Sequence, residues 1–554
     1  MFFIFRRNRF TVNENQLFKW QTHNSSVNPT VKFYAMKAKK TLLAALLALT
    51  SASALRAQVV QIGNLGASMT PDGTLFRTSA GQSLLQVPYG FGWSTLFESH
   101  LWVYYPQGGA GHGIMPLLTS TLGGPQKTFG PQFAPGAYTT PAAMQKYNRT
   151  WRVSQDSVDK HRAFWNTTSY TPAPEVAQFV GSGNPSLGEF PQLQPYANRA
   201  ADNTYNWAQG DYPVLRGKRS VFALYSDRGV AKPDNNAPTS LNIGVEMFEH
   251  PLASVRPAFG QTVFVSFTVT NTGTTPIDSL HVGLVADFDI GQADNDYLGT
   301  DTAGNFVYGM NYFENEPANG YGTAVPAMGV LALSHPLNRS LRYNPGMTSF
   351  SSLAMPVHFQ QRVWMMQGRP NNLTVPQYYA PGDPLSKIGS LDDTLMINRL
   401  DRALVLTLPV QNLAAGATAC FDFAYVVGVG TNRFNSLEVL REYCGEISNE
   451  YQTGAATCAL ETLLSTDEWS GLLAPKVHPN PSSGRVTWTW SNAPRADVTF
   501  RVHDLVGRPI WSETVQPNGT ALEVDWSHLE PGSYWVGVRE EGGHEHVQRV
   551  VLVR

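Results

Sequence analysis

Residues 475–554 alternate apolar and polar positions in several short runs, the pattern of strands that bury one face. Apolar side chains recur at every second position in four of these runs, which cover 486–490, 498–502, 522–526 and 534–538. Prolines and glycines separate the runs, so turns are expected between them. Six or seven short strands of this kind predict a small immunoglobulin-like β-sandwich at the end of the chain.

The same alternation is clearest in the middle of the chain over residues 263–269 and 280–288. Asn271-Thr272-Gly273 lies between these runs, which predicts a β-hairpin within a sandwich-like core. Helical spacing is confined to short stretches, at 154–165 with Ser154 as the cap and near 436–444 with Ser436 as the cap. The predicted fold class is therefore all-β, mainly β-sandwich domains with a few short helices.

Composition agrees with a secreted all-β protein. Charged residues make up only 15% of the chain and aromatic residues 11%, with 48 glycines and 37 prolines. The hydrophobic content of 42% is too high for a disordered chain. A formal net charge of −2 provides no basic field for a nucleic acid. No transmembrane segment is expected, because the longest apolar stretch, 41–54, is too short to span a bilayer.

That stretch is the core of a predicted signal peptide at residues 36–57. Met36 to Lys40 is a basic segment, Thr41 to Ala54 is apolar, and the expected cleavage point lies near Ala57-Gln58. Residues 1–35 precede it and are predicted to be a spurious extension from an upstream start codon, with a genuine long leader as the alternative. This layout predicts Sec export into the periplasm.

The roughly 500 residues that follow are too many for one core, so two or three domains are expected. The predicted divisions are a β-rich, loop-rich region at 58–250, a sandwich-like core at 251–464, a linker at 465–474 and the terminal module at 475–554.

Three spaced motifs in the terminal module resemble the type A C-terminal sorting domain of Bacteroidetes type IX secretion cargo. The motif residues are Asn480, Pro481 and Gly484, then Asp504, Gly507 and Arg508, then Leu529, Gly532 and Tyr534. Two of the glycines, at 507 and 532, are expected to supply turns with positive φ. The resemblance implies recognition by the type IX secretion machinery and a secreted or outer-membrane surface location. An ordinary immunoglobulin-like binding module is the alternative.

The body carries a second resemblance, to a recurring region of uncharacterised Bacteroidetes sorting-domain proteins. The segments that carry it are 210–213, 287–291, 295–299 and 320–322. This resemblance implies an exported, β-rich body and no particular activity. Relatives often have an Asp/Asn/Gly loop suited to calcium before the first segment. Residues 201–206 read Ala-Asp-Asn-Thr-Tyr-Asn here, which departs from that pattern.

The strongest candidate for chemistry is a run of acids: Asp287, Asp289, Asp294, Asp296 and Asp301. The first two are two positions apart on a predicted strand, so their carboxylates share a face. No Lys or Arg occurs between 287 and 316. Crowded carboxylates either raise each other's pKa or bind a cation, and hard oxygen ligands suit Ca²⁺. The alternatives are carboxylates that cap turns, and a glycosidase pair.

Three cysteines occur, at 420, 444 and 458. An oxidising destination would allow a disulfide between Cys444 and Cys458, and three small buried residues are the alternative. The sequence has no C-x-x-C spacing for zinc or thiol exchange.

The familiar short hydrolase and nucleotide-binding motifs are also absent from the sequence. Glycosidases and polysaccharide lyases have no short motif, so this absence does not remove every enzyme. We predict that the body is a non-catalytic structural, adhesive or ligand-binding module for an extracellular glycan or protein. An extracellular hydrolase acting on polysaccharide is the alternative.

Overall fold

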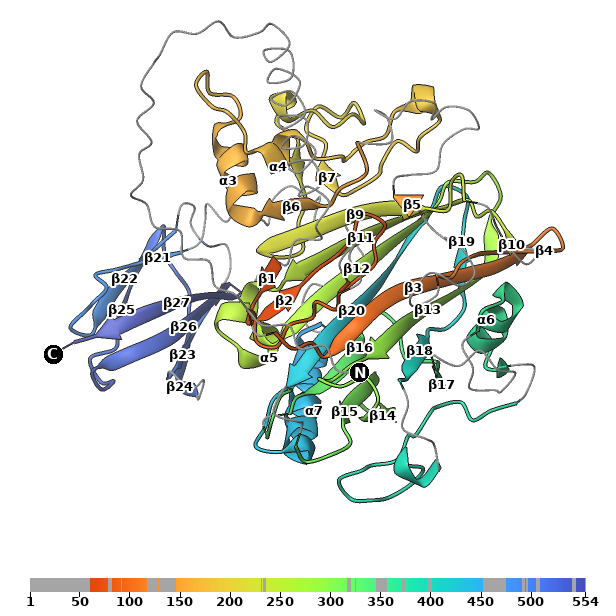
Figure 1. Ribbon diagram of the computed structural model, residues 1–554. Helices are drawn as coiled ribbons and strands as arrows, with labels where there is room; N and C mark the ends of the chain where they lie inside the picture. Colours follow the sequence, from red (N-terminus) through yellow and green to blue (C-terminus); the bar gives the residue numbers. More distant parts are fainter. Residues whose placement is uncertain are drawn as a thin grey trace, which may run out of the picture. The chain divides into compact units, whose positions relative to one another are not determined.

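Alternating apolar side chains draw the long strands of the body into two facing sheets. The computed structural model describes residues 60–77, 82–90, 92–116, 128–129, 146–230, 232, 236–315, 320–323, 325–344, 356–370, 374–395, 401–451, 475–490, 494, 497–504, 509–540 and 545–553. They fall into a body that ends at residue 451 and a C-terminal domain that starts at residue 475 (Figure 1).

The first sheet of the body has antiparallel pairs except at its β10–β4 edge, which is parallel. Its spatial order is β10 (Asn236–Ala237), β4 (Ala110–Ile114), β3 (Leu96–Gln107), β13 (Ile277–Phe288), β18 (Ala403–Thr407) and β17 (Arg339–Tyr343), and β19 (Gln411–Leu413) extends the pairing of β13.

The second sheet is antiparallel throughout its described pairs. Its order is β14 (Asp296–Asp301), β15 (Phe306–Asn311), β16 (Ala327–Ala332), β20 (Thr418–Gly428), β12 (Thr262–Asn271), β11 (Leu241–Glu249), β9 (Arg219–Ser226) and β5 (Thr128–Phe129), with β6 (Trp151–Ser154) also on β9. The inward faces of the two sheets share one large apolar core.

The predicted hairpin between 262 and 288 is wrong, although both of its strands exist. β12 lies in the second sheet and β13 in the first, and the two strands do not pair with each other. Each strand directs its alternate apolar side chains into the shared core, so the chain crosses from one sheet to the other between them. The Asn271 side chain holds this crossing, because its Nδ2 donates to the carbonyls of Thr275 and Leu413.

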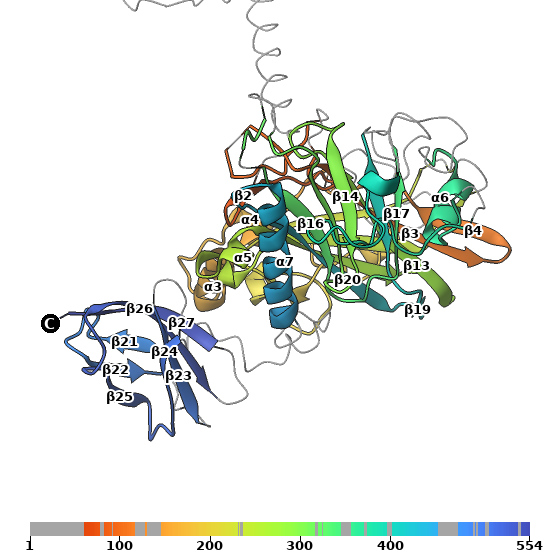
Figure 2. The same ribbon diagram turned by 90° about the horizontal axis from the view of Figure 1, so that it is seen from below.

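Helices cover the outer faces of the two sheets. The helices are α3 (Gln155–Phe164), α4 (Pro174–Ala177), α5 (Pro257–Gly260), α6 (Phe359–Met366) and α7 (Arg433–Glu450), with 3-10 turns η2 (Pro185–Leu187), η3 (Trp207–Gln209), η4 (Pro251–Ser254) and η6 (Asp393–Leu395). Helix α6 packs on the first sheet, and α7 packs on the second beside β16 and β20 (Figure 2). Short pairs β1 (Val60–Ile62) with β2 (Leu65–Ala67) and β7 (Tyr196–Ala197) with β8 (Tyr212–Pro213) complete the body.

The structure confirms the predicted helix at 154–165, with the Ser154 hydroxyl accepting from the Ser157 amide. The helix expected near 436–444 is longer. It begins at Arg433 because the Asn432 side chain accepts the amides of Phe434 and Asn435, the role that was expected of Ser436.

The imidazole ring of His250 lies between two aromatic rings beside α7. Its ring lies 4.5 Å from the Phe259 ring and 5.2 Å from the Phe264 ring, measured between centroids. Its Nδ1 accepts a hydrogen bond from the Leu252 amide at 3.2 Å. Burial, helped by the positive charge of Arg256, lowers the pKa of His250 from 6.5 to about 4.

We therefore expect His250 to make the body sensitive to acid. Between pH 6.5 and pH 4 the unfolded chain binds a proton at this ring and the folded chain does not. This contribution to the free energy of unfolding is fully present above pH 6.5 and falls as the pH drops toward 4, by up to about 3 kcal/mol. The variant His250→Asn keeps a side-chain acceptor for the turn. Its free energy of unfolding should fall less than that of the wild-type protein as the pH drops from 6.5 toward 4. Urea titrations at pH 7 and pH 4.5 measure the difference, and equal pH slopes in both proteins would contradict it.

The C-terminal domain is the predicted β-sandwich. One sheet is β21 (Lys476–His478), β22 (Arg485–Thr489) and β25 (Ala521–Asp525), and the other is β24 (Pro509–Val515), β23 (Val498–His503), β26 (Gly532–Glu540) and β27 (Glu545–Leu552). The alternating residues predicted to face inward form its core, centred on Trp488, Phe500 and Trp526.

Sorting-motif residues hold the entry loop of this domain. The Asn480 side chain donates to the Arg549 carbonyl and accepts the Val551 amide, which ties the loop to β27. Gly484 has φ of 121°, and a Cβ there would lie 2.7 Å from the Ser527 Cα. Only glycine fits this turn. Gly532 does not have the predicted positive φ, because it starts β26 in extended backbone.

The structure describes some of the other motif residues. The Tyr534 hydroxyl donates to the Glu530 carbonyl at 2.6 Å, and the Leu529 amide donates to the Trp526 carbonyl. Asp504 ends the described part of the loop after β23, and Gly507 and Arg508 lie outside the described residues.

Several predictions concern other residues outside the described part. They are the extension at 1–35, the signal peptide at 36–57, the linker at 465–474 and Cys458. Cys420 and Cys444 are buried, and the pairing of Cys444 with Cys458 stays a prediction. None of the described helices has the length and apolar character needed to cross a bilayer.

Candidate functional site: a buried carboxylate cluster

The end of β13 brings two of the predicted acids together with a third from a distant strand. Asp287 pairs with Ala403 of the antiparallel strand β18. Asp289 lies just beyond the end of β13 and Asp401 two residues before β18, so both acids are at the same end of this strand pair. Side chains two positions apart on a strand share a face, so all three carboxylates lie on the outer side of the first sheet.

The three carboxylates are close enough to act as one group. One oxygen from each of Asp287, Asp289 and Asp401 lies within 4.8 Å of the others. The Asp287 side chain is only 2% exposed. In each of the three, Oδ1 is buried and has no hydrogen-bond partner within the described chain. A buried carboxylate oxygen without a donor is unfavourable, so this cluster needs a proton or a cation.

Burial and mutual repulsion raise the pKa of all three acids. For Asp287, burial is the main cause, followed by the charges of Asp289 and Asp401, and its pKa lies well above the usual value. Burial and the charges of Asp401 and Glu98 raise the pKa of Asp289 to about 7. The pKa of Asp401 is raised by burial and by Asp294, against a hydrogen bond with Asp287. Near neutral pH this group holds protons unless positive charge is supplied.

Two basic side chains at this end of the sheet form ion pairs with other acids. Arg402 forms an ion pair of 2.7 Å with Asp392. On the β3 side, Arg77 lies 2.7 Å from Glu98. Burial raises the pKa of Glu98, but the charge and hydrogen bond of the nearby His100, together with those of Arg77, lower it to about 2. Glu98 therefore stays ionised and adds a negative charge near the cluster.

Tyr343 lies in the same row across the first sheet as Asp287 and Ala403. Its backbone pairs with Ala403, which pairs with Asp287, so the small alanine separates the tyrosine from the acid. The Tyr343 side chain is fully buried, and its hydroxyl has no hydrogen-bond partner among the described residues. Burial and then the charge of Asp287 raise the pKa of Tyr343 well above 10.

The remaining acids of the predicted set have other surroundings. Asp294 is exposed in the loop after β13. Asp296 is 2% exposed, and its Oδ2 accepts the Ile290 amide at 3.1 Å. Asp301 forms an ion pair of 2.9 Å with Arg441 of α7. Asp401 was not among the predicted residues, since the sequence alone does not show that β18 lies beside β13.

The cluster suits a single small cation better than a sugar. Glycosidases place two carboxyl groups about 5–5.5 Å or about 6.5–9.5 Å apart on either side of the scissile bond. The innermost side chain here, Asp287, is almost fully buried, whereas both carboxyl groups of a glycosidase must reach the sugar. The geometry therefore disfavours the glycosidase pair.

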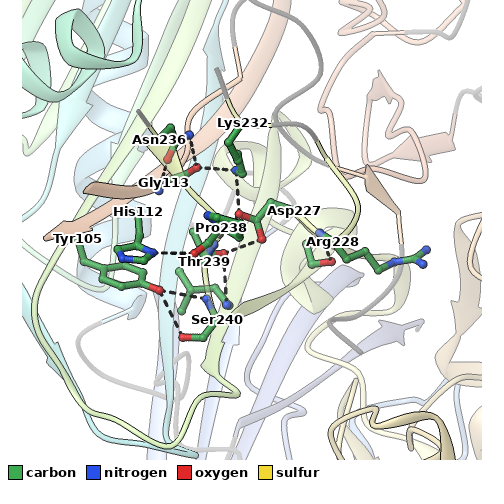
Figure 3. A network of polar contacts seen from close by, with 12 residues as sticks. Tyr105, His112, Gly113, Asp227, Arg228, Lys232, Asn236, Pro238, Thr239 and Ser240 are labelled. Atoms are coloured by element: carbon green, nitrogen blue, oxygen red, sulfur yellow. Dashed lines mark hydrogen bonds and ion pairs between the residues drawn. The ribbon is translucent and has the colours of Figure 1, made fainter. Parts of the chain in front are cut away.

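A second polar cluster, around Asp227, is satisfied by its own partners (Figure 3). The Lys232 Nζ lies 2.8 Å from Asp227 and donates to the Gly113 carbonyl. Asp227 also accepts the amide and hydroxyl of Thr239, and Asn236 bonds both backbone groups of Gly113. These contacts join the β4–β10 edge to the turn after β9, which indicates a structural role.

The loop before Gly210 is organised by Asp211. This buried carboxylate accepts the amides of Arg199 and Asn206, and Asp202 accepts the Thr204 amide. The loop carboxylates thus bond backbone groups.

The aromatic residues 102, 104 and 105 of β3 are all buried, so this run does not form a sugar-binding platform.

Comparison with known proteins identifies the end of the chain. No curated protein matches the sequence. Among solved structures, a polysaccharide lyase is similar at 12% identity over 60% of this chain, with a TM-score of 0.20, and the match spans only 39% of the lyase chain. A similarity this low carries no argument. Residues 476–553 match the family described as "Secretion system C-terminal sorting domain". The predicted sorting domain is thereby confirmed, and the protein is exported cargo of the type IX secretion system, secreted or held at the cell surface.

Proposed function

We propose that the body acts outside the cell as a non-catalytic structural, adhesive or ligand-binding module. The observation that carries this proposal is the sorting domain at 476–553, which indicates where the body works. The acid cluster supports the non-catalytic part, since Asp287 is 2% exposed and so is out of reach of a polysaccharide. An extracellular glycan or protein is the proposed ligand. The proposed route is Sec export to the periplasm, directed by residues 36–57, followed by type IX secretion.

Deleting residues 475–554 tests the route. In cells with a type IX secretion system, we expect the truncated protein to collect in the periplasm and the full chain to reach the medium or the surface. Fractionation and immunoblotting measure both pools, with a second type IX cargo in the same cells as the control. Normal amounts of truncated protein in the medium would overturn the proposed route.

The non-catalytic part is tested separately with the purified body. We expect no release of reducing ends or unsaturated sugars from a panel of polysaccharides, and binding to a member of a glycan or surface-protein array. Turnover of any polysaccharide, abolished by Asp287→Asn, would favour the hydrolase instead. This result would leave the export assignment intact, so the two parts of the proposal can fail independently.

A further inference from the structure

We propose that Asp287, Asp289 and Asp401 bind one Ca²⁺ ion, which joins the ends of β13 and β18. The site is built from two strands more than a hundred residues apart in sequence. It does not depend on the ligand of the body or on whether the body is catalytic. Its function would be to hold the first sheet together where the paired part of these two strands ends.

The spacing of the oxygens fits this ion. Ca²⁺ binds oxygen at about 2.3–2.6 Å, so two ligands on opposite sides of one ion are about 4.8 Å apart. The three carboxylates each offer an oxygen within 4.8 Å of the other two. Small rotations of these side chains are enough to bring all three oxygens onto one ion.

The charges also favour a cation. Three carboxylates meet at the end of two adjacent strands, where like charges directly opposite each other are destabilising. Arg402, which follows Asp401 in the chain, and Arg77 form ion pairs with Asp392 and Glu98. In addition, the Oδ1 atom of each of the three acids has no hydrogen-bond donor among the described residues.

Tyr343 provides an observation that is independent of the acids. It is fully buried in the same row as Asp287, and its hydroxyl has no partner within the described chain. Only Ala403 stands between the tyrosine and Asp287 in this row. A buried hydroxyl on this side of the sheet can donate to a ligating carboxylate or to water on the ion, which would satisfy it.

Ca²⁺ is favoured over Mg²⁺ by the ligand set. Mg²⁺ keeps several waters and usually takes one or two carboxylates in octahedral geometry. Here three carboxylates each offer an oxygen within 4.8 Å of the others, which is more carboxylates than Mg²⁺ usually takes. A protein cage of this kind suits the larger ion with its flexible coordination.

Calcium titration of the purified mature chain tests the site. We expect one Ca²⁺ per chain by equilibrium dialysis, and a melting temperature at least about 3 °C higher in millimolar CaCl₂ than in EDTA. MgCl₂ at the same concentration should give a clearly smaller rise. The absence of both bound Ca²⁺ and a Ca²⁺-dependent rise in the wild-type chain would overturn the proposal.

Asp289→Asn and Asp401→Asn locate the site. Each removes one charge from a repelling group, so in EDTA the variants should fold and melt at or above the wild-type temperature. Both should lose the bound ion and the rise in CaCl₂. Asp278→Asn is the matched control, because this acid is exposed at the far end of the strand that carries Asp287. This variant should keep the bound ion and the rise in melting temperature in CaCl₂. Retention of bound Ca²⁺ by both cluster variants would overturn the assignment of these ligands.

Discussion

Replacing Arg216 by methionine is expected to lower the free energy of unfolding of the body by about 3–5 kcal/mol. Arg216 lies over the outer face of the second sheet, and only 11% of its side chain is exposed. Its guanidinium is 3.5 Å from Glu246 on one side and 3.5 Å from Asp422 on the other. These acids flank Ser266 in one row across three strands. Methionine fills much of the same volume but leaves two buried carboxylates without their common counter-ion.

Other hydrogen bonds hold the two acids in place around Arg216. The Arg216 amide and the Ser220 hydroxyl donate to Glu246, at 2.9 Å and 2.7 Å. The Tyr451 hydroxyl donates to Asp422. Burial raises the pKa of Glu246, against the lowering effect of Arg216. Without the arginine, Glu246 should take up a proton more readily, so the loss of stability should shrink as the pH falls toward 5.

Calorimetry of the full chain at pH 7.5 measures the loss for Arg216→Met. The matched control is Arg162→Met, because the pair of Arg162 with Asp159 is partly exposed, with 47% of the Asp159 side chain in contact with solvent. Such a pair contributes at most about 1 kcal/mol. A triple change, Arg216→Met with Glu246→Gln and Asp422→Asn, should recover part of the stability. Equal losses for the two single arginine variants would contradict the role assigned to this network.

The sequence could predict strands but not their partners. Alternation in 263–269 and 280–288 correctly identified β12, β13 and their core-facing sides. It could not show whether the intervening segment turns back within one sheet or crosses to the other, since both paths bury the same apolar faces. The contacts that decide it involve Leu413, well over a hundred residues away in sequence from Asn271.

The carboxylate cluster shows the same limit. Period-two spacing is enough to place Asp287 and Asp289 on one face of a strand. Asp401 directly precedes the strand-rich block that starts at Arg402, and alternation with Ala403 would have placed it on an outer face. The missing information was the pairing of β18 with β13. In the same way, Asp301 forms an ion pair with Arg441 of α7 and is not part of the cluster. The local sequence does not show this contact.

The C-terminal domain was the most predictable part, because its signals are local. Its strands are short, its turns carry Gly and Pro, and its motif residues bond within the same 80 residues or so. Small domains of this kind depend strongly on a few large core side chains.

Trp526→Ala should strongly destabilise the sorting domain and lower export of the whole protein. Trp526 is 1% exposed and contacts the rings of Trp488, Phe500 and Trp511 at centroid distances between 6.1 and 6.4 Å. Truncating a buried tryptophan costs about 3–5 kcal/mol. A domain of about 80 residues has only about 4–12 kcal/mol to lose. The loop held by Asn480 would then lose the β27 backbone to which it is bonded.

Secreted and cell-retained protein, measured together with limited proteolysis of the C-terminal domain, tests this prediction. Trp526→Phe is the matched control, since it keeps most of the ring contacts and should be exported at close to the normal level. Ile510→Ala, at a side chain 44% exposed, should leave the domain protease-resistant. Full export of Trp526→Ala with a protease-sensitive domain would mean that the secretion machinery reads a linear segment. The dependence of export on Trp526 therefore distinguishes recognition of a folded surface from recognition of the motif residues alone.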